Sequence, residues 1–223
     1  GMNFEGCTDT AFYQLNTTSL ATPSLCLVTV DSLSNYNEVY WDKTLFPQAD
    51  TFIVYRETSA SIYTPIAHIP KNAFSSYVDT NRSIGPITGN PNFSLHRYKL
   101  QYIDSCGNLS AMSPFHESVK ITDNLTGNFS WNYYAIEGVG PLQTLNYVLT
   151  RRNVVSGITV TVAVAAGNQL SDPQYAALSA TGNMKWFVYA DGFSCNPSLK
   201  TSETAAVKNR TKSNQSVQRI CGP

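Results

Sequence analysis

The fold of this chain can be worked out from one stretch, Tyr98-Lys-Leu-Gln-Tyr-Ile-Asp-Ser-Cys-Gly-Asn-Leu-Ser-Ala-Met-Ser113. It begins as an alternating run, which places two tyrosines and a leucine on one face of a strand. The alternation stops at Asp-Ser-Cys-Gly-Asn, where Gly107 and Asn108 both tolerate positive φ. A second extended run follows. The stretch therefore predicts a β-hairpin with a thiol, Cys106, at its tip.

A degenerate copy of this hairpin occurs later, at Lys185-Trp-Phe-Val-Tyr-Ala-Asp-Gly-Phe-Ser-Cys-Asn196. It repeats the basic residue, the aromatic residue, the alternating strand, the Asp and the cysteine. Earlier strands repeat as well, because Glu38–Trp41 matches Gly127–Trp131 and Thr51–Arg56 matches Leu145–Arg151. The sequence thus predicts two consecutive copies of one β unit.

Short strands fill both halves of the chain, with turn signals every ~8–12 residues and no helical period, which indicates antiparallel sandwiches. The expected strands are residues 25–30, 38–41, 51–57, 63–69, 76–79, 98–103 and 117–122, and then 127–131, 145–151, 158–166, 185–190 and 207–212. Pro65 favours an edge position for its strand. Residues 171–178 predict a short helix. We expect the second half of the chain to contain no counterpart of the strand at 76–79.

Four motifs stand out in the first half: Val39-x-Trp41, Phe52-x-Val-Tyr-Arg56, Tyr77-Val-Asp-Thr80, and Tyr98-x-Leu-x-Tyr102 followed by Gly107-Asn-x-Ser-x-x-Ser113. Together they resemble a fibronectin type III module. With residues 25–31 and 104–110, they are similar to tandem modules of bacterial surface proteins that occur near gliding-motility-associated or type IX sorting domains. The resemblance implies an all-β fold of two consecutive fibronectin type III/immunoglobulin-like antiparallel β-sandwiches.

The resemblance covers residues 22–123 well and 124–212 loosely. We therefore expect a lead-in strap at 1–21, a first domain at 22–123, and a divergent second domain at 124–223 with a polar tail. The resemblance implies that Trp41 and Trp131 are core residues and that Tyr98 lies at the corner before the sixth strand. Trp186 replaces that tyrosine in the second copy, so we expect its corner hydrogen bond to be lost. The link at 122–125 has no Gly/Ser run, which predicts a packed junction.

Composition excludes several classes of function. The 15 basic and 15 acidic residues cancel, and no run of Lys or Arg provides a footprint for nucleic acid. No apolar run reaches the ~18–20 residues of a membrane span. Charged residues make up 13%, about half the usual ~25%, which suits an extracellular, cell-surface or periplasmic protein. Gly1 before Met2 is typical of a cleaved tag, so we expect any signal peptide to have been removed.

The five cysteines form no Cys-x-x-Cys pair, and the three histidines are widely separated, so no metal site is expected. Disulfides fit an oxidising compartment. In a sandwich of this kind the first strand starts at the end that carries the hairpin tip, which predicts a Cys26–Cys106 bond. Cys195–Cys221 would attach the polar tail to the second domain. Cys7 is left over, or competes for Cys26 or Cys106.

No catalytic motif is present, and we expect neither an enzyme nor a cofactor. A Cys–His pair of Cys106 with His96 or His116 is the remaining catalytic alternative. Asp79 and Asp104 are interpreted as turn-capping residues.

Aromatic and apolar residues in three expected loops suggest a recognition surface at one end of the scaffold. They are Leu45, Phe46, Tyr133, Tyr134 and Phe193. The hypothesis is a non-catalytic adhesion or spacer module of an envelope or secreted assembly, with a protein or glycan partner at the cell surface. The alternatives are a carbohydrate-binding accessory module of a polysaccharide-degrading system and, less favoured, a divergent hydrolase.

Overall fold

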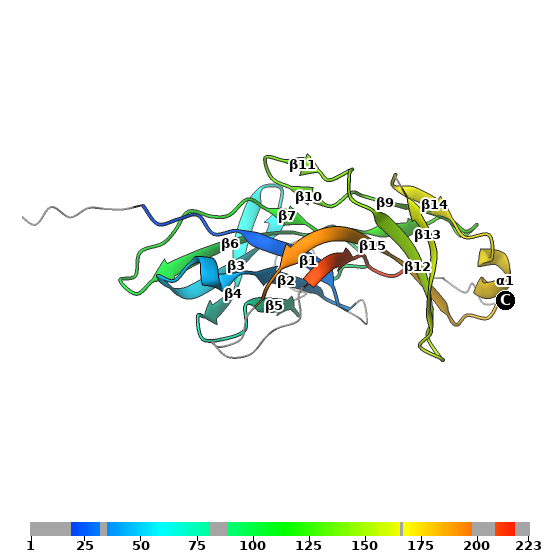
Figure 1. The fold of residues 1–223 in the computed structure, drawn as a ribbon, viewed down its shortest axis with the longest axis horizontal. Coiled ribbons are helices and arrows are strands. Elements are labelled where there is room, and N and C mark those ends of the chain that lie inside the picture. Colours follow the sequence, from blue (N-terminus) through cyan, green and yellow to red (C-terminus); the bar gives the residue numbers. More distant parts are fainter. Residues whose placement is uncertain (1–18, 32–34, 81–88, 166, 198–207, 217–223) are drawn as a thin grey trace, which may run out of the picture.

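A computed structural model describes residues 19–31, 35–80, 89–165, 167–197 and 208–216. Most of the expected strap, together with Cys7 and Cys221, lies outside the described residues. Two β-sandwiches follow one another along an elongated molecule (Figure 1). No helix in the described ranges is long and apolar enough to cross a bilayer.

The first sandwich combines a three-stranded sheet, in the order β1-β2-β5, with a larger sheet in the order β11-β10-β7-β6-β3-β4. Its own strands are β1 (Leu25–Val30), β2 (Asn37–Trp41), β3 (Ala49–Ser59), β4 (Ile62–Pro70), β5 (Ser76–Asp79), β6 (Arg97–Asp104) and β7 (His116–Glu117). A 3-10 helix, η1 (Lys43–Leu45), precedes β3. β4 is an edge strand, as Pro65 predicts.

The second sandwich repeats this plan, which confirms the fold class. Its sheets have the orders β14-β9-β8 and β13-β12-β15-β16. The elements are β8 (Ile121–Asp123), β9 (Asn128–Trp131), β12 (Tyr147–Asn153), β13 (Thr159–Ala165), β14 (Gln169–Ser171), α1 (Tyr175–Ser179), β15 (Met184–Cys195) and β16 (Lys208–Lys212). The short helix is confirmed. The expected absence of a counterpart to β5 is wrong, because β14 pairs with β9 as β5 pairs with β2.

The two halves interlock where they meet. The strand expected at 117–122 is divided, because β7 pairs with β6 whereas β8 pairs with β9. Strand pairing therefore passes from the first sandwich to the second between Glu117 and Ile121. In addition, β10 (Ala135–Ile136) and β11 (Gly140–Pro141) extend the sheet of the first sandwich through β7. Residues of the second half thus help to build the first.

A continuous apolar core runs through both sandwiches. Trp41 is fully buried and Trp131 is 4% exposed, which confirms both as core residues. Trp41 packs on Phe52, and Trp131 packs on Tyr147, each across the two sheets of its own sandwich. Burying such large aromatic surfaces supplies much of the driving force for folding.

A buried ion pair closes the corner of the first sandwich. Arg56 donates to Asp79 over 2.7 Å, and both side chains are fully buried. The Tyr98 hydroxyl donates to the same carboxylate over 2.8 Å. The interpretation of Asp79 as a turn cap is therefore wrong: it ties β5 to β3 and β6. Burial beside the Asp79 carboxylate raises the pKa of Tyr98 well above its usual value.

The second sandwich rebuilds this corner with different residues. Arg151 donates to Asp172 over 2.9 Å, and the Trp186 indole N–H donates to the same carboxylate over 2.8 Å. The expected loss of the corner hydrogen bond is wrong, because an indole N–H reaches the acceptor as a hydroxyl does. Burial raises the pKa of Asp172, but hydrogen bonds from Trp186 and Arg151 outweigh it and hold that pKa below its usual value.

The predicted hairpin is present, and serines of its return segment complete it. Gly107 adopts φ +84° at the tip. The Ser113 hydroxyl accepts from the Leu100 N–H over 2.8 Å, in place of a backbone carbonyl. In the second sandwich the Ser213 hydroxyl accepts from the Val188 N–H over 2.9 Å. The serines in the motif after the tip therefore satisfy buried strand donors.

Candidate functional site: the junction of the two sandwiches

The second hairpin lies along the first strand of the other sandwich. Figure 1 shows β15 and β16 beside β1. The Thr211 hydroxyl donates to the Val28 carbonyl over 2.6 Å, and the Lys212 N–H donates to the Thr29 hydroxyl over 2.8 Å. The Lys212 ammonium donates to the Asp31 carbonyl over 3.0 Å, and burial lowers the pKa of Lys212 to about 8. Residues about 180 positions apart in sequence are thereby joined.

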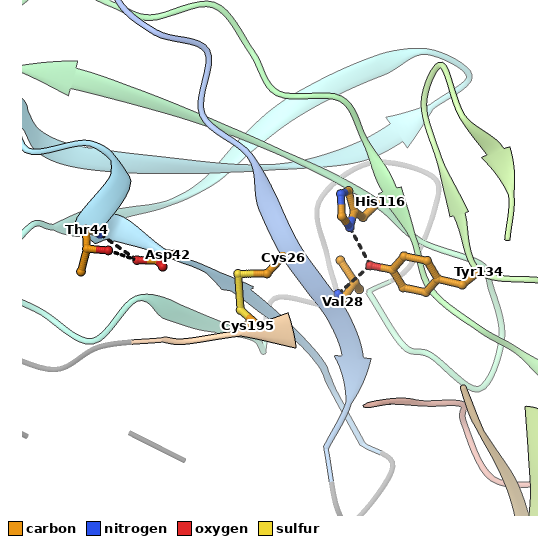
Figure 2. Close-up of a disulfide and its surroundings, with 7 residues drawn as sticks. All are labelled: Cys26, Val28, Asp42, Thr44, His116, Tyr134 and Cys195. Atoms are coloured by element: carbon orange, nitrogen blue, oxygen red, sulfur yellow. Dashed lines mark hydrogen bonds between the residues drawn. A yellow bond between two sulfur atoms is a disulfide. The ribbon is translucent and has the colours of Figure 1, made fainter. Parts of the chain in front are cut away.

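A disulfide between Cys26 and Cys195 makes this contact covalent (Figure 2). The two Cα atoms are 5.3 Å apart, although 169 positions separate the cysteines in sequence. Both predicted pairings are wrong, because Cys26 is not bonded to Cys106 and Cys195 is not bonded to Cys221. The reason is that β15 runs on to residue 195, well past its expected end at 190, and carries its cysteine to β1. Cys106 is a free, exposed thiol.

Tyr134 joins three segments beside the disulfide (Figure 2). Its hydroxyl oxygen accepts from the Val28 N–H over 2.9 Å and lies 2.7 Å from Nδ1 of His116. The side chain is fully buried, and burial raises its pKa far above the usual value. One phenol therefore connects β1, β7 and the segment before β10. Sequence reasoning missed this role, since neither spacing nor neighbouring residues distinguish Tyr134 from Tyr133.

His116 is held in its neutral form. Its side chain lies in the interior, and burial lowers the pKa of His116 to about 4. A neutral ring with its proton on Nε2 can accept the Tyr134 O–H at Nδ1 while the phenol oxygen accepts from the Val28 N–H. Protonation at Nδ1 would leave the phenol hydrogen without this acceptor. The network is therefore complete only when His116 carries no charge.

Two asparagines hold the short link between the sandwiches. Asn132 accepts from the Lys120 N–H over 2.7 Å and donates to the Ser118 carbonyl over 2.9 Å. On the other side, Asn214 accepts from the Ile121 N–H over 2.7 Å. The backbone of residues 118–121 is thus anchored to both halves of the second sandwich. A packed junction is present, at this link and not at 122–125.

The first predicted recognition loop is only partly exposed. Phe46 is 5% exposed and packs against Phe52 and Tyr102, so its prediction as an exposed binding residue is wrong. The cause is η1, whose capping by Asp42 turns the following residue into the core. Leu45 is 62% exposed, and its role in binding stays a prediction.

The other loop aromatics pack on the junction. Tyr134 is buried, so its prediction as an exposed binding residue is also wrong. Phe193 is half-buried with its ring centroid 4.7 Å from that of Tyr134, and Tyr133 is half-buried against Tyr147. Binding by Tyr133 and Phe193 stays a prediction. The physical reason for the error is that these loops face the neighbouring sandwich, which an isolated module would not have.

The described ranges contain no group of three or more His, Cys, Asp or Glu side chains that could hold a metal ion. The Cys106 thiol has no hydrogen-bonded histidine among them, and His116 is engaged by Tyr134. The arrangement at the junction supports fixed packing of two domains, and its chemistry is that of a covalent and hydrogen-bonded joint.

No protein-family model matches the chain, and no curated protein matches it. Among solved structures, it is similar to an Fn3-like protein from Clostridium thermocellum, with 25% identity and a TM-score of 0.34 over 44% of this chain and 90% of that one. It is also similar to the central fibronectin-III array of RIM-binding protein, with 11% identity and a TM-score of 0.29; the match covers 91% of this chain and 72% of that one. A third similar structure is the chicken interferon gamma receptor alpha chain, with 12% identity and a TM-score of 0.29; the match covers 88% of this chain and 100% of that one.

Proposed function

We propose that this protein is a non-catalytic, rigid two-domain spacer or adhesion module outside the cell or at the cell surface. The observation that carries the proposal is the joint between the sandwiches, which is closed by the Cys26–Cys195 disulfide. Domains joined only by a linker and a small interface move relative to one another by default. Here a covalent bond, a buried phenol and a continuous core oppose that movement.

The disulfide also supports the location. Such bonds persist in oxidising compartments and are rare in the cytosol. The low content of charged residues, 13%, agrees with a secreted protein. The motifs shared with bacterial modules near gliding-motility-associated or type IX sorting domains extend the proposal to a bacterial envelope or secreted assembly. Its partner there would be a protein or a glycan.

Rigidity can be measured with pairs of spin labels. Cys7, Cys106 and Cys221 are replaced by Ser, and labels are introduced by Leu45→Cys and Val155→Cys, whose native side chains are exposed on different sandwiches. We expect one narrow distance distribution while the disulfide is intact. A broad distribution in that state would overturn the proposal. Labels at Leu45→Cys and Val78→Cys, both in the first sandwich, are the control and should give a narrow distribution throughout.

A further inference from the structure

An open cleft of about 560 Å³ lies where the two sandwiches meet. One wall is the loop before β6, at residues 93–95, and the floor is the outer face of the sheet formed by β8, β9 and β14. This volume is within the ~300–1,000 Å³ of small-molecule sites, which form preferentially at domain interfaces. None of the five loop residues predicted to bind is among the residues that line this cleft.

The floor presents hydrogen-bonding groups that the protein itself does not use. The side chains of Thr122, Ser130 and Gln169 line the cleft and have no hydrogen-bond partner in the described parts of the chain. Two hydroxyls and an amide supply both donors and acceptors. They are therefore free to bind a polar ligand.

The walls, by contrast, are fixed by internal hydrogen bonds. The Lys120 ammonium donates to the Phe93 carbonyl over 2.8 Å, and Asn168 donates to the Trp131 carbonyl over 3.2 Å. The first contact joins the loop of the first sandwich to the link before β8, and the second ties the segment before β14 to β9. A site that is already ordered loses less conformational entropy when a ligand binds.

An apolar platform lies above this floor. The Phe93 side chain is 69% exposed and Leu95 is 39% exposed, both at the cleft. An aromatic face in water beside unpaired amide and hydroxyl groups suits a ligand that has both apolar faces and polar edges. A sugar ring has this character, because its C–H faces stack on aromatic rings while its hydroxyls form hydrogen bonds.

Charge and shape favour a neutral sugar chain over an anion or a charged peptide. Among the described residues that line the cleft, Lys120 alone is charged, and its ammonium is already bonded to the Phe93 carbonyl. A second cleft of about 310 Å³ adjoins the first, sharing Ser130 and Gln169, and is lined mainly by further amides and hydroxyls. The two together give a polar path along the sheet for several sugar residues.

We propose that this junction cleft binds a neutral oligosaccharide segment, with one sugar face on Phe93 and hydroxyls bonded to Thr122, Ser130 and Gln169. The site goes beyond the spacer role and does not depend on it. A broad spin-label distance distribution would overturn the spacer proposal and leave the sugar-binding proposal untouched. A failed sugar titration would overturn sugar binding and leave the spacer proposal untouched.

The test titrates the full chain, disulfide intact, with neutral hexasaccharides of glucose in β-1,4 and β-1,3 linkage, of xylose, of mannose and of N-acetylglucosamine, and with a heparin hexasaccharide as the anionic probe. Amide NMR signals and calorimetry report binding. At least one neutral hexasaccharide should bind and shift the signals of Ser130 and Gln169. Phe93→Ala should weaken that binding about tenfold or more, and Phe93→Tyr should keep it within about threefold.

Leu109→Ala is the matched control, because it removes another exposed apolar side chain that lies outside the cleft lining. It should leave sugar affinity unchanged. Phe93 is itself exposed, so its substitution should preserve the urea midpoint and any lost binding can be assigned to the site. No binding of any neutral probe at millimolar concentration, equal affinity in Phe93→Ala, or preference for the heparin hexasaccharide would each overturn the proposal.

Discussion

Replacing Tyr134 by Phe removes a single oxygen atom from the centre of the junction. That oxygen accepts from the Val28 N–H and contacts His116 Nδ1, at 2.9 and 2.7 Å. No water can replace it without displacing packed side chains, since Tyr134 is fully buried. Both partners would keep their positions in the fold but lose their hydrogen bonds.

The magnitude follows from the two orphaned groups. A buried donor or acceptor left without a partner costs about 1–3 kcal/mol. The removed hydroxyl no longer has to be buried, which offsets part of the loss. We therefore expect the free energy of unfolding to fall by about 2–4 kcal/mol, which exceeds the usual effect of a conservative substitution.

Urea denaturation followed by tryptophan fluorescence measures the change. With a denaturant slope of about 2–3 kcal/mol/M, the midpoint should fall by roughly 1 M. Tyr133→Phe, at the adjacent residue, is the matched control, because the Tyr133 hydroxyl has no hydrogen-bond partner in the described residues. Its removal should change the free energy of unfolding by less than about 0.5 kcal/mol. Equal midpoints for the two variants would refute the assignment of Tyr134 as the hydrogen-bonding centre of the joint.

Three further predictions concern single positions. The pKa of His116 is about 4 in the folded chain and near 6.5 when unfolded, so the unfolded state takes up a proton first as the pH falls. The free energy of unfolding should therefore fall by about 3 kcal/mol between pH 6.5 and 4. Urea unfolding curves at both pH values should show this decrease in the wild-type protein and lack it in His116→Gln. Gly127→Ala should cost at least about 2 kcal/mol in urea denaturation, because φ is +88° and the new Cβ would lie 2.6 Å from the Tyr175 Cβ, whereas Gly138→Ala, with φ +79° and open space, should cost only about 1 kcal/mol. Tyr98→Phe removes a hydrogen bond to a buried carboxylate and should lower the thermal midpoint by an amount equivalent to about 1.5–3 kcal/mol, and an unchanged midpoint would contradict that role.

Local patterns in the sequence were sufficient for the strands. The alternating run from Tyr98 and the β-branched run from Thr51 form two adjacent interior strands of their sheet, and Pro65 lies on the edge strand. Alternation works because side chains of a strand point to opposite faces, which is a property of a few neighbouring residues. The repeat of these patterns was enough to predict two sandwiches.

The corners show where matching by residue type fails. Asp172 follows the short strand β14 as Asp79 ends β5, and both accept a hydrogen bond from an arginine. The sequence around Asp172 lacks the Tyr-Val before it, which concealed the strand. The partner Trp186 looked unsuitable because it has no hydroxyl, although its N–H makes the same bond. The chemistry was preserved while the residue types changed.

By itself, the sequence determined the all-β class, the approximate positions of most strands and the burial of Trp41 and Trp131, since these depend on periodicity and on local hydrophobicity. Only the tertiary structure decided which cysteines pair, why Phe46 and Tyr134 are buried, and where an open cleft remains. The reason is physical. The disulfide, the burial of Tyr134 and the cleft depend on how two sandwiches dock, which brings Cys26 to Cys195 across 169 positions that no local pattern connects. Phe46 is buried by packing of η1 inside the first sandwich, on residues distant in sequence.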